Sequence, residues 1–219
     1  MATRLVLAEL ADAYQRSSGV KVHFESVGGV DAARRVQAGE AFDVVVLAAE
    51  AIDTLVAAGR AVAASRVDLM QSGVAIAVRA GSPRPDIGTQ DALRQALLSA
   101  RTVGYSTGPS GVALSRLLAR WGLADRLRDR IVQAPAGVPV GALVASGEVE
   151  LGFQQLSELM HLEGIDVLGP MPHGVEIVTT FSGARCAASL QPEAVSGLLD
   201  FLRSGDAAQA KRRHGMAPA

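Results

Sequence analysis

Residues 104–114, with the sequence GYSTGPSGVAL, concentrate groups that could bind a small anion. The stretch contains hydroxyls and glycines and then passes into an apolar pattern with helical spacing. Free N–H groups in the first turn of a helix attract negative charge, because the helix dipole is positive at that end. We therefore predict that Ser106, Thr107, Ser110 and Gly111 contact a small anion.

Two further strand-to-helix junctions offer similar chemistry. ESVGGV places Ser26, Gly28 and Gly29 ahead of a helix, and QAPAGVPVG places Val138 and Pro139 at the start of another. Ligands of open α/β sheets bind at this edge, where strands end and helices begin. Any one junction alone is more simply a helix cap. Two such loops from different halves of the chain would form a shared anion site.

The elements that position these loops alternate along the chain. Apolar and polar periodicity predicts helices that alternate with strands at 20–26, 42–48, 72–81, 101–106, 130–134, 150–155, 164–170 and 175–181. This order indicates an α/β protein with mostly parallel sheets. Parallel α/β units usually open with a strand, whereas this chain opens on a helix. We therefore expect that a strand and its following loop are missing from the N-terminus.

Composition excludes several classes of function. The net charge of −1 and the pI of about 6.4 remove any electrostatic argument for nucleic acid. A single cysteine, Cys186, rules out an intrachain disulfide. No apolar run reaches the length of a membrane span, and Glu9 and Asp12 interrupt the start where a signal peptide would be apolar. We expect either a cytoplasmic protein or a chain that has lost its natural beginning.

Acid–base and metal chemistry have few candidates. His23, Glu25, Glu50 and Glu158 could move a proton, although His23 and Glu25 fit a solvated strand face and Glu50 fits a helix cap. The remaining histidines lack partners at metal-ligand spacing, so we predict no metal and no cofactor. The residues alone do not establish catalysis.

Several segments together resemble one family. FESVGGVDAARRVQAGEAFDVVVLAAE, SGVAIAVRAGSP, GYSTGPSG and ALVASGEVELGFQQLSEL follow the order and spacing of periplasmic solute-binding proteins of the molybdate-binding type. The resemblance runs from about residue 2 to the end of the chain. It implies the α/β, two-lobe type 2 periplasmic-binding-protein fold, with lobe 1 at 1–74 and 180–219 and lobe 2 at 75–179. Each lobe is expected to hold a mostly parallel sheet flanked by helices, with hinge strands crossing between lobes.

The resemblance also implies a site. Ser26 matches the family's second-loop hydroxyl ligand, and residues 106–111 match the first loop of the distal lobe. Val138 lies at the helix start that donates a backbone N–H in molybdate binders, and Gln154 and Gln155 lie where those proteins carry a tyrosine. The lobes would close on an oxyanion or a small carboxylate. The family further implies a periplasmic location, a monomer, and an ABC-transporter membrane component as partner.

Two departures from the family pattern affect the expected ligand. The family's first strand and first serine-bearing loop have no counterpart here, and the tyrosine is replaced by Gln154 and Gln155. Glutamine donates and accepts hydrogen bonds, so it suits a carboxylate better than a tetrahedral oxyanion. GFQQLSEL is also similar to a subgroup of aconitate isomerases on this fold.

Three functions therefore stay open. The first is capture of a small anion for ABC-type uptake, and the alternative is an isomerase of a small tricarboxylic acid. The effector domain of a transcription regulator is a third, which would need a DNA-binding helix-turn-helix ahead of residue 1.

Overall fold

The structure is a computed structural model that describes residues 1–135 and 137–219. The chain divides into two compact units. Unit 1 comprises residues 1–72 and 179–219, and unit 2 comprises residues 73–178. The lobe boundaries expected from sequence fall after residues 74 and 179, whereas the observed ones fall after residues 72 and 178.

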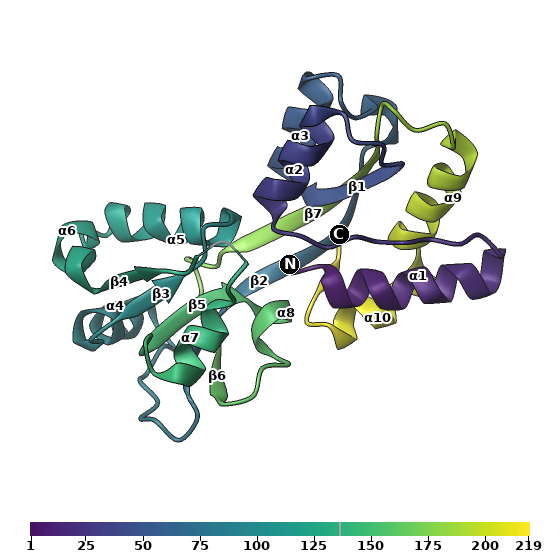
Figure 1. The fold of residues 1–219 in the computed structure, drawn as a ribbon. Helices are drawn as coiled ribbons and strands as arrows, with labels where there is room; N and C mark the ends of the chain where they lie inside the picture. The colour runs from purple at the N-terminus through teal and green to yellow at the C-terminus, as the bar shows by residue number, and fades with distance from the viewer. Residues whose placement is uncertain (136) are drawn as a thin grey trace. The chain divides into compact units, whose positions relative to one another are not determined.

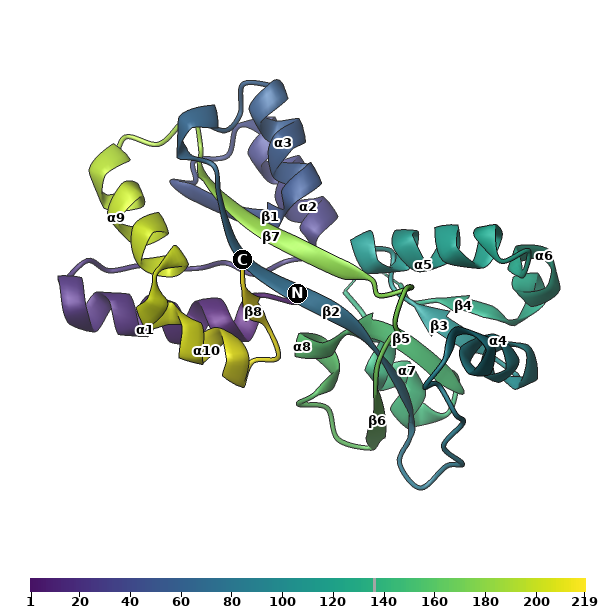
Figure 2. The same ribbon diagram turned by 180° about the vertical axis from the view of Figure 1, so that it is seen from behind.

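Unit 1 holds short strands between two groups of helices (Figures 1 and 2). The strand β1 pairs with β7, and β8 pairs with the first half of β2, both in antiparallel fashion. The strands are β1 (Val44–Ala48), β2 (Val67–Arg79), β7 (Val178–Arg185) and β8 (Ala217–Pro218). The helices are α1 (Arg4–Ser18), α2 (Gly29–Ala38), α3 (Ala49–Ala57), η1 (Ala63–Ser65), α9 (Pro192–Arg203), η3 (Gly205–Ala207) and α10 (Ala208–Arg213).

Strand β1 is covered by apolar side chains on both faces. Val45 and Leu47 pack in a cluster with residues of α2 and α3. Val44 and Val46 pack against a second cluster, which is formed largely by α1, α9 and α10. This two-sided burial explains the continuous apolar run and confirms the strand predicted there.

The strand predicted at 20–26 is wrong. Residues 19–28 form an irregular connection between α1 and α2 (Figure 1). Val20, Val22 and Phe24 nevertheless pack against the cluster of α1, α9 and α10, while Lys21, His23 and Glu25 are exposed. The alternating pattern thus correctly indicates one buried face. A strand also needs a neighbour to pair with its backbone, and within the described chain this segment has none.

Unit 2 combines parallel and antiparallel pairing. Strand β3 pairs in parallel with β4 and β5, and the second half of β2 pairs in antiparallel fashion with β5 and β6. The strands are β3 (Val103–Tyr105), β4 (Ile131–Gln133), β5 (Leu151–Gln155) and β6 (Ile165–Pro170). The helices are α4 (Gln90–Ser99), α5 (Pro109–Arg120), α6 (Ala124–Leu127), η2 (Arg128–Arg130), α7 (Val140–Ser146) and α8 (Leu156–Leu159). The sequence predicted a mostly parallel sheet in each lobe. In unit 1, by contrast, the β1–β7 and β2–β8 pairings are antiparallel.

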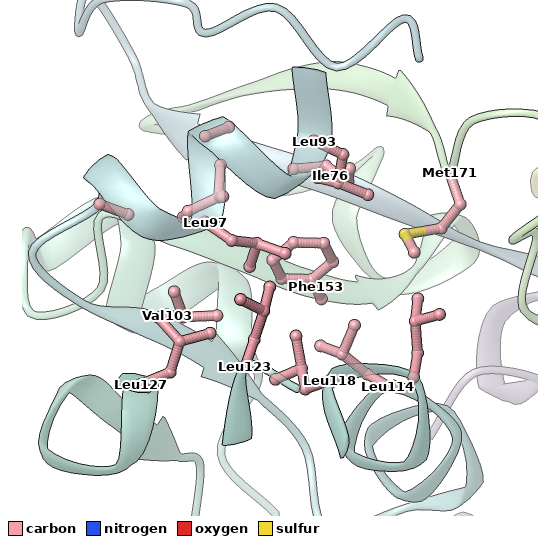
Figure 3. Close-up of a cluster of buried hydrophobic side chains, with 14 of the residues drawn as sticks. Ile76, Leu93, Leu97, Val103, Leu114, Leu118, Leu123, Leu127, Phe153 and Met171 are labelled. Carbon is pink, nitrogen blue, oxygen red and sulfur yellow. The ribbon is translucent and has the colours of Figure 1, made fainter. Parts of the chain in front are cut away.

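The main core of unit 2 surrounds Phe153 of β5 (Figure 3). The ring is 1% exposed, and aliphatic side chains of α4 and α5 pack around it, among them Leu97 and Leu114. A fully buried aromatic side chain contributes on the order of 1.5–3 kcal/mol to folding. This core fixes β5, which leads directly into α8.

Two glycines bring α7 and the segment that follows it close to the sheet. Gly104 of β3 and Gly152 of β5 are direct partners in the parallel ladder. A Cβ on Gly152 would lie 2.4 Å from a methyl of Val144, and one on Gly104 would lie 2.6 Å from a methyl of Val149. Both distances are shorter than a carbon–carbon contact allows, so the packing of α7 requires glycine at position 152, and the packing of Val149, which follows α7, requires glycine at position 104.

Candidate functional site

Three loops of unit 2 lie at one edge of its sheet. Tyr105 of β3 is level with Gln133 of β4 and with Phe153 of β5 in the parallel ladders. The segments that follow these strands therefore emerge on the same side, where α/β proteins commonly bind ligands. They are the loop into α5, the loop into α7 and the start of α8. Ala136, in the second loop, lies outside the described residues.

The loop into α5 presents several polar groups. Ser106 Oγ accepts a hydrogen bond from the Gly108 N–H at 3.3 Å and lies 3.4 Å from Ser110 Oγ. The helix begins after Gly108 without a side-chain cap. Pro109 has no N–H, so Ser110 and Gly111 carry the N–H groups that the first turn can offer to a ligand. Thr107 is exposed beside them. Contact of these residues with a ligand stays a prediction.

Gly111 has a geometric role in this loop. A Cβ at this position would lie 1.7 Å from the carbonyl oxygen of Ser106 and 3.0 Å from the ring of Tyr105. No side chain fits there, and only glycine lets the loop fold back against its helix. Packing within the loop thus accounts for a glycine at position 111, and no ligand contact is needed to explain it.

Gln154 organises the neighbouring loop. Its side chain is buried, and its Oε1 accepts a hydrogen bond from the Gly141 N–H at 3.3 Å. The amide therefore caps the first turn of α7 from the adjacent strand. The Val138 N–H, which resembles a ligand donor in sequence, donates to the Pro135 carbonyl at 3.0 Å. The predicted ligand contacts of Val138 and Gln154 are untested, and both groups take part in hydrogen bonds within unit 2.

Gln154 also hydrogen-bonds Glu158, the partly buried carboxyl of α8. Burial raises the pKa of Glu158 above its ordinary value, whereas the hydrogen bond from Gln154 acts in the opposite direction. Gln155 is likewise buried. Ser157 is buried as well, and its Oγ has no hydrogen-bond partner in the part of the chain that the structure describes. Ser157 is not among the residues expected from sequence, because a serine within SEL is typical of an ordinary helix position.

The predicted loop of unit 1 lies at the start of α2. Gly28 precedes the helix, and no side-chain cap is formed there. Ser26 is half-buried and Gly29 is exposed. Asp31 lies in the first turn and pairs with Arg34 at 2.9 Å. This carboxylate opposes the attraction of the helix dipole for an anion.

The other candidate acids and bases of unit 1 have surface positions. Glu25 pairs with Arg35 at 2.5 and 3.1 Å, and Arg35 also pairs with Glu40 at 2.8 Å. The hydrogen bond from Arg35 is the main reason that the pKa of Glu25 is lowered. His23 and Glu50 are exposed. Glu25 is thus an ion-pair partner in this structure.

Metal and membrane features can be assessed for residues 1–135 and 137–219. Within these ranges, no group of three or more His, Cys, Asp or Glu side chains is placed to hold a metal ion. No helix there is both long and apolar enough to cross a membrane.

Comparison with known proteins identifies the family. Residues 1–217 match the family described as bacterial extracellular solute-binding protein, and the chain belongs to this family. It is 44% identical over 218 residues to a protein of a Pseudomonas species named aconitate isomerase. The match covers 97% of this chain and 83% of that protein.

Solved structures share the fold. The periplasmic molybdate-binding protein of Azotobacter vinelandii has a TM-score of 0.80 at 20% identity, with 99% of this chain and 95% of that chain covered. The substrate-binding domain of a molybdenum ABC transporter from Clostridium difficile has a TM-score of 0.78 at 18% identity, with 100% and 95% covered. The type 2 periplasmic-binding-protein fold expected from sequence is confirmed.

Proposed function

We propose that this protein binds a small organic anion with several carboxylates, of the kind represented by aconitate. The loop into α5 carries the proposal, because it combines the first-turn N–H groups of Ser110 and Gly111 with the hydroxyls of Ser106, Thr107 and Ser110. We propose that Ser26, Gly28 and Gly29 of unit 1 are also ligand-binding residues.

The class of ligand follows from the side chains near this loop. The resemblance to molybdate binders places Gln154 and Gln155 where those proteins carry a tyrosine, and amides can both donate to and accept from a carboxylic acid. The Pseudomonas relative named aconitate isomerase supports the same class. As a solute receptor, the protein would reside in the periplasm and deliver its ligand to an ABC transporter.

A ligand panel tests the proposal. Thermal unfolding would be followed with cis-aconitate, trans-aconitate, citrate, molybdate, sulfate and phosphate. A ligand at one hundred times its dissociation constant should stabilise the protein by about 2.7 kcal/mol. A shift with the tricarboxylates is the expected result. A shift with molybdate or sulfate alone would contradict the proposed class.

The hydroxyls of the loop can be tested directly by calorimetric titration with the ligand from this panel. Replacing either Thr107 or Ser110 singly by Ala should weaken binding about 10- to 100-fold, because a hydrogen bond to a charged group contributes roughly 1.5–3 kcal/mol. Ser115→Ala is the matched control, since Ser115 is exposed on the same helix beyond its first turns. Equal affinities for all variants would show that the hydroxyls of this loop do not contact the ligand.

We propose isomerisation of the bound tricarboxylate as a second candidate function. A base would remove a proton from the methylene carbon of aconitate, and the electron pair would form a new double bond to the central carbon. The electrons of the old double bond would then take a proton at the former vinyl carbon. The reaction consumes no oxidant or reductant. Glu158 is the group that we propose as this base, because it is a partly buried carboxyl with a raised pKa at the edge of the sheet where the loops lie.

Conversion of cis- to trans-aconitate, followed by NMR, tests this function. Glu158→Gln should lower kcat by at least 100-fold while leaving ligand binding measurable, since general-base catalysis contributes about 10²–10⁴-fold. Glu163→Gln, at an exposed position beyond α8, is the control. Tight binding without turnover by the unmodified protein would contradict the isomerase function and support the solute-receptor function.

A further inference from the structure

Helix α5 forms one wall of a groove on the surface of unit 2. The opposite wall is the segment 174–178, which runs into the first residue of β7 (Figure 1). The groove has a volume of about 540 Å³, and all of its lining residues belong to unit 2. Part of the lining is apolar and includes the buried side chains of Leu117 and Val175. Arg116 and Arg120 add positive charge to it.

These two arginines lack a negative partner. Both are exposed, they lie four residues apart on one face of α5, and neither forms an ion pair or a hydrogen bond within the part of the chain that the structure describes. Like charges at this spacing repel each other and destabilise a helix. Arg120 lies in the last turn, where positive charge complements the helix dipole, but Arg116 lies before that turn. The helix itself therefore gives no reason for a charge at position 116.

The carboxylate in the lining does not compensate these charges. Glu176 accepts a hydrogen bond from the Gly174 N–H at 2.8 Å and pairs with His173 Nδ1 at 3.0 Å, so it is engaged within its own turn. The surrounding sequence adds to the excess, because residues 92–130 contain seven arginines and two aspartates. The groove thus presents positive charge that an acidic partner could neutralise.

Apolar surface beside the arginines favours a protein segment as this partner. Val112, one turn before Arg116, is 46% exposed, and Val178 on the opposite wall is 56% exposed. Pockets for small molecules enclose most of the ligand, whereas these valines and both arginines are open to solvent. Arginine beside exposed apolar side chains is typical of protein–protein interfaces.

We propose that this groove binds an extended acidic segment of another protein. Val112, Arg116 and Arg120 repeat every four residues along α5, which places them about 6 Å apart along the helix axis. Alternate residues of an extended chain share one face and lie about 6.6 Å apart. A segment with an apolar residue and two acidic residues at alternate positions therefore matches this row in spacing and in charge. The inference does not rest on the proposed function.

A peptide titration tests the proposal. An acetylated and amidated peptide of sequence SLSESES is added to the isotope-labelled protein, and the amide signals are followed by NMR. Signals of residues 112–120 and 174–178 should shift, and added salt should weaken binding because exposed ion pairs are screened. The peptide SLSQSQS should bind about fivefold more weakly or worse, since it loses two ion pairs. No shift of the groove signals with the acidic peptide would overturn the proposal.

A pair of substitutions locates the binding site. Arg116→Gln combined with Arg120→Gln should weaken binding of the acidic peptide about fivefold or more, while glutamine preserves the helix. Arg84→Gln combined with Arg126→Gln is the matched control, because it removes the same charge from two exposed positions outside the groove. Equal losses in the two double variants would indicate a general effect of charge and contradict the proposal.

Two other occupants of the groove are distinguishable. Succinate that shifts the same signals with the affinity of the acidic peptide would identify a small dicarboxylate as the occupant. Dimerisation in sedimentation experiments that is lost on Arg116→Gln combined with Arg120→Gln would identify a second copy of this chain. Either result would contradict the proposal, whereas a monomer that binds the peptide and ignores succinate is the expected outcome.

Discussion

At the scale of single residues, Lys211 of α10 is a charged residue type at a buried position. It is fully buried, and its amine has no hydrogen-bond partner in the described part of the chain. Burial lowers the pKa of this amine below its ordinary value, because the charged form loses its hydration. The residue therefore costs folding free energy at neutral pH.

We predict that Lys211→Met stabilises the protein by about 1–3 kcal/mol near pH 7, the usual cost of a buried unsatisfied polar group. The folded-state pKa lies below the unfolded one, so the penalty is complete at low pH. It fades as the pH rises from the folded-state pKa towards 10.5. Urea unfolding at pH 7 and pH 10 measures both effects. Lys21→Met, at an exposed site, should change stability by less than about 0.5 kcal/mol.

At the scale of elements, the contact between α7 and the sheet connects packing to the candidate site. Gly152 leaves room for Val144, and the first turn of α7 is held by Gln154. A displaced helix would therefore move both the loop ahead of α7 and the amide that caps it.

We predict that Gly152→Ala destabilises the protein by about 1–3 kcal/mol, because the new methyl would lie 2.4 Å from Val144. It should also weaken binding of the ligand found in the panel, and calorimetric titration measures this effect. Gly73→Ala in β2 is the matched control, since no atom lies within 4 Å of the added methyl. Equal urea-unfolding midpoints for the two variants would contradict this account.

Sequence patterns predicted elements well where burial alone decides them. The strand at 44–48 is covered by apolar side chains on both faces. Its continuous apolar sequence indicates such two-sided burial. The alternation at 20–26 was equally regular, yet pairing depends on a distant neighbour that a local pattern does not record. Gln154 shows the same limit in the site, since its bond to Gly141 joins residues from two elements.

At the scale of the whole molecule, the two units differ in how the chain builds them. Unit 2 is one continuous segment with its own core around Phe153. Unit 1 is assembled from both ends of the chain, and β1 depends on β7, which follows unit 2 in sequence.

We predict that a fragment of residues 73–178 folds alone, with a single cooperative thermal transition followed by near-ultraviolet circular dichroism. A fragment of residues 1–72 lacks β7 and should show no such transition. A broad, featureless melt of the longer fragment would mean that its core requires unit 1.

The two ends of unit 2 meet in space. The Val74 N–H donates to the Ile177 carbonyl at 2.8 Å, although 103 positions separate them along the chain (177 − 74). A gene segment that encodes such a unit can be exchanged for a homologous one, because the two points at which it joins the rest of the chain stay equally close together. New specificity could thus be acquired by recombination in a single event, with the scaffold of unit 1 retained.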